Sequence, residues 1–381
     1  MRITKLFQEF FQSENAGGLV LIACTFLSLL LANSHLGEAY ASIWALPVGS
    51  HELAHWINDG LMAIFFLLIG LELKREMIRG ELSTRGKATL PVIAAIGGMV
   101  VPALLYTLFN YGTELQSGAG IPMATDIAFA IGVMSILGDR VPLSLKILLT
   151  ALAVIDDLGA ILIIALFYTD DLSMVNLAVS GGIYALLLFM NRLQVKPLLP
   201  YLLGGTVMWY FMLHSGVHAT ITGVLLAYAI PFGDGSQHSA SYKLQHLLHK
   251  PVAFFIVPVF ALANTCIFID RDWTHGLMES NSLGILAGLF IGKPVGIFLF
   301  IWLAVVLKLS PMPERANWMQ ILGVGCLAGI GFTMSIFITL LAFDQIHAVT
   351  TSKISILIAS LFSGLLGYAL LQMASVKAKQ A

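Results

Sequence analysis

Five ionisable residues lie inside apolar stretches of this sequence, where charged side chains are rare. At the centre of a membrane helix each such residue costs about 2.5–3.5 kcal/mol, so stability alone would not select the set. We therefore interpret these residues as candidates for chemistry that needs a buried charge. They are Asp59, Asp126, Asp156, Asp157 and Lys293.

The adjacent acids Asp156 and Asp157 have the type and spacing needed to bind a proton or a hard cation. They lie in Leu-Ala-Val-Ile-Asp-Asp-Leu-Gly-Ala-Ile-Leu, midway along an apolar run. Neighbouring residues on a helix point about 100° apart, so the two carboxylates can share a cavity and still face different partners. Carboxylates this close cannot both ionise cheaply. We therefore expect a proton and a cation to compete for the same oxygens.

The other buried charges are expected to act with this pair. Lys293, in Ile-Gly-Lys-Pro-Val-Gly-Ile, needs an acidic partner. Asp156 or Asp157 is the natural candidate, because an ion pair at about 4 Å is worth roughly 4 kcal/mol. Asp126 lies in Gly-Ile-Pro-Met-Ala-Thr-Asp-Ile-Ala-Phe. For Asp59, near the end of a span, a purely structural ion pair fits the sequence as well as a functional role does.

The composition indicates a membrane protein that must position these charges on helices. Of the 381 residues, 58% are apolar and 11% are charged, against about 25% charged residues in an ordinary soluble domain. Each membrane helix needs about 20 apolar residues, which gives roughly twelve spans and leaves no room for a soluble domain. We expect one transmembrane domain over residues 1–381. The predicted span centres are Cys24, Phe65, Gly98, Ala130, Val154, Tyr184, Val207, Val224, Val259, Phe290, Gly331 and Leu361.

The basic residues predict the orientation of these spans. Lys and Arg of short loops favour the cytoplasmic side, and here they occupy every second loop or tail. Only Arg271 falls in an intervening loop. Both termini are therefore expected in the cytoplasm. The basic residues of the cytoplasmic set are Arg2, Lys5, Lys74, Arg75, Arg79, Arg85, Lys87, Arg140, Arg192, Lys196, Lys243, Lys250, Lys308, Arg315, Lys377 and Lys379.

Two of the spans contain breaks. Pro122 and flanking glycines interrupt the span that carries Asp126, and the segment 323–335 is rich in glycine. Close helix packing would also explain the glycines, but broken helices are tolerated at membrane depth where they line a cavity. Two crossing broken helices would place the positive N-terminal ends of their half-helices close together, and likewise the negative C-terminal ends. Asp126 would then compensate the positive N-terminal ends, and Lys293 the negative C-terminal ends.

Five motifs together resemble the NhaA family of bacterial sodium/proton antiporters. They are Thr-Asp-Ile-Ala-Phe-Ala, Ile-Asp-Asp-Leu-Gly-Ala, Gly-Lys-Pro, Gly-Ile-Gly-Phe-Thr-Met-Ser-Ile-Phe and Ser-Gly-Val-His-Ala-Thr. The resemblance runs nearly end to end. It implies an all-α polytopic membrane fold with about 12 transmembrane helices, inverted repeats and two crossing broken helices. The two broken helices would carry Thr125–Asp126 and Gly329–Thr333.

The resemblance also implies roles for the buried charges. Asp157 is expected to be the principal carboxylate for the transported Na+ and for protons. Asp156 is its neighbour in the same ion site and the expected partner of Lys293. Thr125 and Asp126 are expected at the crossing of the broken helices.

A cytoplasmic cluster that responds to pH is implied by the same resemblance. Its members are Glu72, Arg75, Glu76, His246 and His249. The family pattern has Glu in Leu-Glu-His-x-Leu-His, whereas this chain has Gln245. We expect Gln245 to lie in a solvated loop, where an added charge would have a small effect. The outward loop 35–53 resembles in position the small hairpin of the family's dimers, so we also expect a homodimer.

These observations predict a secondary active antiporter of the bacterial inner (plasma) membrane. It would exchange cytoplasmic Na+ or Li+ for external H+ by alternating access, electrogenically and under control of pH, in the service of pH homeostasis. Its expected partners are these ions and membrane lipid. No cofactor, nucleic acid or enzyme activity is expected. Cys24, Cys266 and Cys326 lie far apart in apolar sequence, so neither a disulfide framework nor a metal cluster is indicated.

Two other classes of protein also place acidic residues inside a membrane. A sodium-coupled symporter of an organic anion is the alternative, and a large cavity at the membrane midplane would favour it. An intramembrane aspartic protease also needs two aspartates, but on separate helices and usually in a Gly-x-Gly-Asp motif, which is absent from the apolar spans. The adjacent acids and Lys293 disfavour both alternatives.

Overall fold

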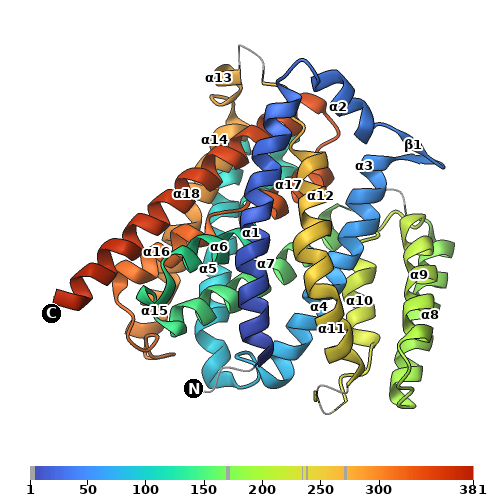
Figure 1. The fold of residues 1–381 in the computed structure, drawn as a ribbon, viewed down its shortest axis with the longest axis horizontal. Coiled ribbons are helices and arrows are strands. Elements are labelled where there is room, and N and C mark those ends of the chain that lie inside the picture. Colours follow the sequence, from blue (N-terminus) through green and yellow to red (C-terminus); the bar gives the residue numbers. More distant parts are fainter. Residues whose placement is uncertain (1–4, 169–171, 234, 237–238, 270–272, 381) are drawn as a thin grey trace.

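A computed structural model of the chain describes residues 5–168, 172–233, 235–236, 239–269 and 273–380. The described part is a bundle of helices, with one short hairpin at the end opposite the N-terminus (Figure 1). Because Arg2 and Arg271 lie outside the described residues, their predicted positions are not covered. The elements of the first half are α1 (Lys5–Ala32), α2 (Gly37–Trp44), β1 (Pro47–Val48), β2 (His51–Glu52), α3 (Leu53–His55), η1 (Trp56–Leu61), α4 (Met62–Arg79), α5 (Arg85–Asn110), η2 (Glu114–Met123), α6 (Ile127–Ile136), η3 (Gly138–Arg140) and α7 (Leu143–Phe167).

The second half of the chain is also helical throughout its regular elements. They are α8 (Met174–Arg192), α9 (Leu199–Leu213), α10 (Ile221–Ala229), α11 (Ala240–Pro251), η4 (Val252–Ile256), α12 (Val257–Asn264), α13 (Trp273–Gly276), α14 (Ser280–Ala287), η5 (Gly288–Gly292), α15 (Lys293–Val306), α16 (Trp318–Ala328), α17 (Phe332–Ala342) and α18 (Ile346–Gln380).

The predicted spans agree with the observed helices. Among the described residues, eight helices are long and apolar enough to cross a membrane, or up to ten when each of two bent helix pairs is counted as one span. The centres predicted near Val207 and Val224 fall on the shorter helices α9 and α10. Gly331, the predicted centre of another span, is the N-cap residue of α17. The all-α polytopic membrane fold is therefore confirmed.

The hairpin after α2 is the only sheet among the described residues. Its two strands pair antiparallel, with Pro47 opposite Glu52 and Val48 opposite His51. Gly49 in the tight turn has φ +69°, a conformation that glycine adopts without steric cost. The sequence alone indicated no more than a turn here.

Both predicted breaks are present, and they meet. The first broken helix pairs η2 with α6 through an extended segment at 124–126, and the second pairs α16 with α17 at a bend of 44°. The Asp126 amide donates to the Ile330 carbonyl at 2.7 Å, and the Thr125 hydroxyl donates to the Ala328 carbonyl at 2.9 Å. The Asp126 amide and the carbonyls of Ala328 and Ile330 thus find partners across the crossing, as burial in a membrane requires.

Close packing of α5 against α15 places Lys293 near these breaks. A Cβ at Gly97 would overlap the carbonyl oxygen of Gly296, and a Cβ at Gly296 would overlap that of Gly97. Small residues allow such close backbone approach in membranes. Gly97 and Gly296 therefore allow the two helices to pack with their backbones in contact. The π turn η5 ends immediately before Lys293, and its wider i→i+5 turn rotates the residues that follow relative to a regular α-helix.

Candidate ion-binding site

Lys293 and Asp156 form an ion pair in the middle of the bundle. Lys293 Nζ lies 2.9 Å from Asp156 Oδ2, and neither side chain is exposed. The Thr125 hydroxyl lies 2.9 Å from the same carboxylate oxygen and 2.9 Å from the Ala328 carbonyl, so its one proton is shared between these two acceptors. The sequence left Asp156 and Asp157 open as partners of the lysine, and the structure selects Asp156.

The same lysine caps the C-terminal end of η2, the first half of a broken helix. Lys293 Nζ also donates to the carbonyl of Met123, the last residue of η2. A cation at the C-terminal end of a helix is favourable because the end carries partial negative charge. The position agrees with the compensation predicted for Lys293.

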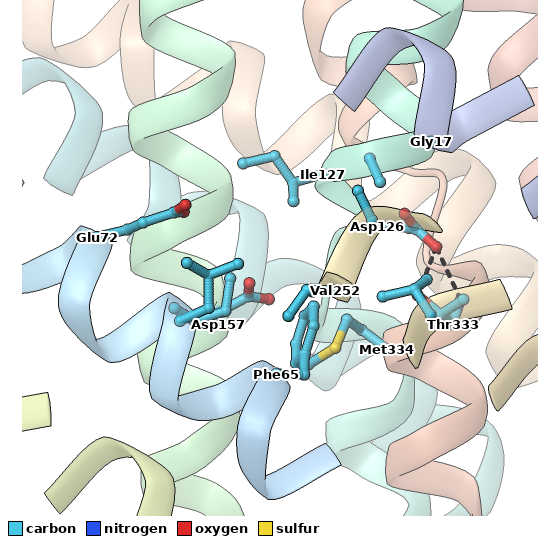
Figure 2. A pocket seen from close by; sticks show the side chains of 14 residues that line it. Gly17, Phe65, Glu72, Asp126, Ile127, Asp157, Val252, Thr333 and Met334 are labelled. Carbon is cyan, nitrogen blue, oxygen red and sulfur yellow. Dashed lines mark hydrogen bonds between the residues drawn. The ribbon is translucent and has the colours of Figure 1, made fainter. Parts of the chain in front are cut away.

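Asp126 lies at the N-terminal ends of the two half-helices α6 and α17. Its Oδ1 accepts a hydrogen bond from the Phe129 amide at 2.9 Å, which caps α6. Its Oδ2 accepts from the Thr333 amide at 3.1 Å and from the Thr333 hydroxyl at 2.5 Å, near the start of α17 (Figure 2). One buried carboxylate thus lies at two positive helix N-termini, as predicted.

Asp157 faces a cavity, whereas its neighbour Asp156 is paired with Lys293. It is fully buried, and neither of its oxygens accepts a hydrogen bond from any residue that the structure describes. It borders a cavity of about 20 Å³ that Glu72, Asp126 and Thr333 also line (Figure 2). That volume is enough for about one water-sized particle. Carboxylate and hydroxyl oxygens are the ligands that hard cations prefer.

Apolar side chains form the rest of the cavity wall. Phe65 and Leu68 come from α4, Val252 from η4, and Met334 from α17. These walls keep bulk water from the acids and strengthen electrostatic interactions between them. The arrangement can therefore hold a small ion or a proton, but no bulky solute.

The predicted pH cluster is only partly brought together. Glu72 is buried, and its Oε1 lies 3.4 Å from His249 Nε2. Arg75 Nη2 and Glu76 Oε1 form a neighbouring pair at 2.8 Å. His246 is on the exposed side of α11, where its ring stacks on Tyr242 with ring centroids 6.3 Å apart.

The expectation of a solvated loop around Gln245 is wrong. Gln245 lies on α11 with 1% of its surface exposed, beside Glu72. The reason is packing: α11 is amphipathic and turns this face toward α4. A change at Gln245 therefore acts on a buried cluster.

The prediction that Lys74 lies in a loop is also wrong. It lies in α4 with 8% of its surface exposed. Its Nζ donates to the carbonyls of Ala227, Tyr228 and Ile230, at 3.2, 2.9 and 2.5 Å. The apolar residues on both sides of Lys74 were a signal that the helix continues to Arg79.

Two contributions to the site were missed by sequence reasoning. The sequence predicts Thr333 on a broken helix. It does not predict that the amide and the hydroxyl of Thr333 both donate hydrogen bonds to Asp126. Glu72 was assigned to the pH cluster, whereas it also lines the cavity beside Asp157. The helical spacing of Phe65, Leu68 and Glu72 on one face was the available signal.

Comparison with known proteins agrees with this geometry. The family described as Na+/H+ antiporter 1 matches residues 8–371. The protein named Na+/H+ antiporter NhaA of Cytophaga hutchinsonii is 60% identical over 373 residues, which cover 98% of this chain and 96% of the relative. Its namesake from Flavobacterium psychrophilum is 60% identical over 368 residues, with 97% and 96% covered.

A solved structure shows the same fold at low sequence identity. The sodium proton antiporter MjNhaP1 from Methanocaldococcus jannaschii superposes with a TM-score of 0.58 and 16% identity, and 97% of each chain is covered. The family match and the relatives extend over almost the entire sequence. This chain belongs to the Na+/H+ antiporter 1 family.

Proposed function

We propose that this chain exchanges cytoplasmic Na+ or Li+ for external H+, with Asp157 as the carboxylate that both ions occupy in turn. The observation that carries the proposal is the position of Asp157. Its oxygens accept no hydrogen bond from the described residues and border a cavity of about 20 Å³. The relatives named Na+/H+ antiporter NhaA support the same activity.

The size of the cavity argues against transport of an organic anion. Sites for small organic ligands occupy about 300–1,000 Å³, whereas the cavity beside Asp157 has about 20 Å³. The symporter alternative is therefore not supported. The membership in an antiporter family also makes this protein a transporter and not an enzyme.

Exchange follows from competition at one set of oxygens. A cation that enters beside Asp157 needs the carboxylate ionised, so binding releases a proton, and a returning proton displaces the cation. Asp126 and Thr333 on one side, and Glu72 on the other, supply the remaining oxygens of the cavity wall. Waters retained by the ion would complete its coordination shell.

The Asp156–Lys293 pair supplies a route to a second proton. A cation drawn toward both acids weakens the attraction between Asp156 and Lys293, which are 2.9 Å apart. Lys293 can then give up a proton, because the ionised Asp156 of the pair carries none. Exchange of two protons for one Na+ moves net charge, so the membrane potential would drive it together with the pH gradient.

Alternating access needs one closed path and one that opens. On the hairpin side of the cavity, Phe337 packs against Phe66 and Phe260 with ring centroids 5.4 and 6.3 Å apart. The three rings are at most 1% exposed. On the other side the cavity reaches Glu72 and, through it, His249. We infer that ions enter from the cytoplasm past Glu72 while the aromatic rings close the outward path.

The cellular setting is part of the same proposal. The protein is a multi-pass membrane protein, and we place it in the bacterial inner membrane as a single transmembrane domain over residues 1–381. The charge pattern of the loops supports cytoplasmic termini. With that orientation the β1–β2 hairpin faces outward, where it would pair with a second copy. Control by pH through Glu72 and His249 fits a role in pH homeostasis.

Proteoliposomes test the proposed exchange. A pH gradient is imposed across vesicles that contain the purified protein, and Na+, Li+ or K+ is added across a range of pH. Na+ and Li+ are expected to collapse the gradient, and K+ is expected to leave it intact. If neither Na+ nor Li+ affects the gradient at any pH, the proposed function is wrong.

A further inference from the structure

The start of α17 has no capping side chain of its own. α17 begins at Phe332, and the residue before it, Gly331, has no side chain that could accept a hydrogen bond from the first turn. A Cβ at Gly331 would overlap the hydroxyl of Ser335, so a larger residue does not fit there. The first amides of a helix have no partner inside the helix, and a buried amide without a partner costs free energy. The caps of α17 must therefore come from other elements.

Two side chains from other elements cap this end. Asp126 Oδ2 accepts a hydrogen bond from the Thr333 amide at 3.1 Å. Ser360 Oγ, on α18, accepts one from the Phe332 amide at 3.2 Å. Ser360 is 4% exposed, and it does not line the cavity that Asp126 borders. The second cap is thus a buried hydroxyl that lies outside the ion site itself.

The helix that carries this hydroxyl follows the second broken helix across its bend. A Cβ at Gly367 of α18 would lie 3.0 Å from the Gly323 carbonyl oxygen on α16. At the bend, a Cβ at Gly329 would lie 3.0 Å from Ser363 Oγ. Positions 360, 363 and 367 share one face of α18, because residues three and four apart are neighbours on a helix. α18 therefore contacts α16, the bend and the start of α17 with a single face.

Two connections lead from the Ser360 cap to Asp126. Thr333 follows Phe332 directly, and its amide and hydroxyl both donate to Asp126 Oδ2 (Figure 2). The Phe332 ring packs edge to face on Phe129, with ring centroids 5.8 Å apart. The Phe129 amide in turn donates to Asp126 Oδ1 at 2.9 Å. A displacement at Phe332 would therefore disturb the hydrogen bonds of both Asp126 oxygens.

We propose that Ser360 is a positioning residue for the ion site, because its hydroxyl fixes the start of α17 and so holds Thr333 and Asp126 in the arrangement that binds Na+. This role rests on the exchange proposed for Asp157. Ser360 itself touches neither the ion nor the transported proton. Without its cap the first turn of α17 frays, and the binding arrangement is populated for a smaller fraction of the time. The apparent sodium affinity falls in proportion to that fraction.

The sodium dependence of exchange tests this role. Sodium-induced collapse of a pH gradient in proteoliposomes is measured over a range of sodium concentrations, at one pH at which the wild type is active. Ser360→Ala is expected to raise the half-saturating sodium concentration about fivefold, the factor that corresponds to the loss of one hydrogen bond. The maximal rate should change little, because saturating sodium restores the binding arrangement. A purely structural role would lower the melting temperature and leave the half-saturating concentration unchanged.

Two further variants show whether the hydroxyl at this position is the cause. Ser363→Ala is the matched control, because Ser363 lies one turn later on the same face of α18 and is fully buried. Its Oγ has no hydrogen-bond partner among the residues that the structure describes. This variant is expected to keep the wild-type half-saturating concentration. Ser360→Thr retains a hydroxyl and is expected to keep it as well.

The results that would overturn the role are distinct from those that would overturn the function. A wild-type half-saturating concentration in Ser360→Ala, or an equal rise in Ser363→Ala or Ser360→Thr, shows that Ser360 does not position the site. If Ser360→Ala does not fold, Ser360→Cys decides in its place. Sulfur is a weak acceptor, so a smaller rise supports the role and a wild-type value overturns it. Absence of sodium-dependent exchange in the wild type would overturn the proposed function and this role with it.

Discussion

Glu72 Oε1 lies 3.4 Å from His249 Nε2, and the same Glu72 side chain lines the cavity that Asp157 borders. The contact joins α4 to α11 across a region with little access to water. A proton gained or lost at His249 therefore changes the charge next to the ion site itself. We propose that this contact lets the charge of His249 influence ion binding in the centre of the bundle.

Replacement of Asp157 by Asn is expected to abolish exchange and to leave a folded protein. The amide keeps the size of the side chain but removes both its charge and its proton-binding oxygen. Asp156→Asn should impair exchange nearly as much. Sodium-induced collapse of a pH gradient in proteoliposomes measures the effect, with gel filtration as the check on folding. Normal exchange by the Asp157 variant would show that the ion is held elsewhere.

Lys293→Ala is expected to destabilise the protein in detergent. The change leaves Asp156 as a buried charge without its cation, a loss of about 3–5 kcal/mol in soluble proteins. The melting temperature should fall clearly. The double variant Lys293→Ala with Asp156→Asn is the control, because removal of both charges should restore part of the stability. An unchanged melting temperature in the single variant would contradict the role of the ion pair.

Thr333→Val is expected to weaken the crossing of the broken helices. It removes the hydroxyl that donates to Asp126 at 2.5 Å and keeps the backbone bond. A hydrogen bond to a charged group contributes about 1.5–3 kcal/mol, so both stability and sodium affinity should fall. Thr339→Val is the matched control, since the Thr339 hydroxyl donates within its own helix to the Ser335 carbonyl at 2.8 Å. Equal losses in the two variants would argue against a special role for Thr333.

Gln245→Glu is expected to move the onset of activity to higher pH. Gln245 and His249 are four residues apart on α11, so their side chains are neighbours, and both are buried. An added carboxylate favours the imidazolium form of His249, so its proton leaves at higher pH. Burial should make the shift about one pH unit, which corresponds to about 1.4 kcal/mol, and larger than an exposed pair would give.

Sodium-dependent exchange measured across pH gives the midpoint for Gln245→Glu. His246→Gln is the control, because His246 is exposed and should have a small effect. An acidic shift in Gln245→Glu, or no shift with intact transport, would show that this segment does not set the pH response. Competition at Asp156 and Asp157 would then be the simpler origin of pH control.

The sequence predicted the buried charges and the breaks because both violate strong rules of membrane helices. Asp156, Asp157 and Lys293 stand out as charges in apolar runs, and glycine or proline marks each break. The choice of Asp156 as partner of Lys293 was open from the residues alone. It depends on which face of α15 carries the lysine, and the π turn η5 before it alters that face.

The remaining differences arise from contacts between distant segments. Gln245 and Lys74 looked like loop residues because the positive-inside rule concerns sidedness and says nothing about burial. Their burial results from the packing of α4 against α11 and α10. Asp59 could be flagged as a charge near the end of a span, but its partner His218 is 159 residues away in sequence. Single-sequence patterns contain no information about such a pair.

The double role of Asp126 restricts how the bundle can rearrange. Its two oxygens hold the start of α6 and the start of α17 at the same time. Neither half-helix can tilt alone without the loss of a bond to a buried charge. Any rearrangement that exposes Asp157 to the other side must therefore carry α6 and α17 as one rigid unit, while their neighbours slide past it. Spin labels on α6 and α17 should keep a constant separation through the transport cycle, whereas labels on α4 and α17 should not.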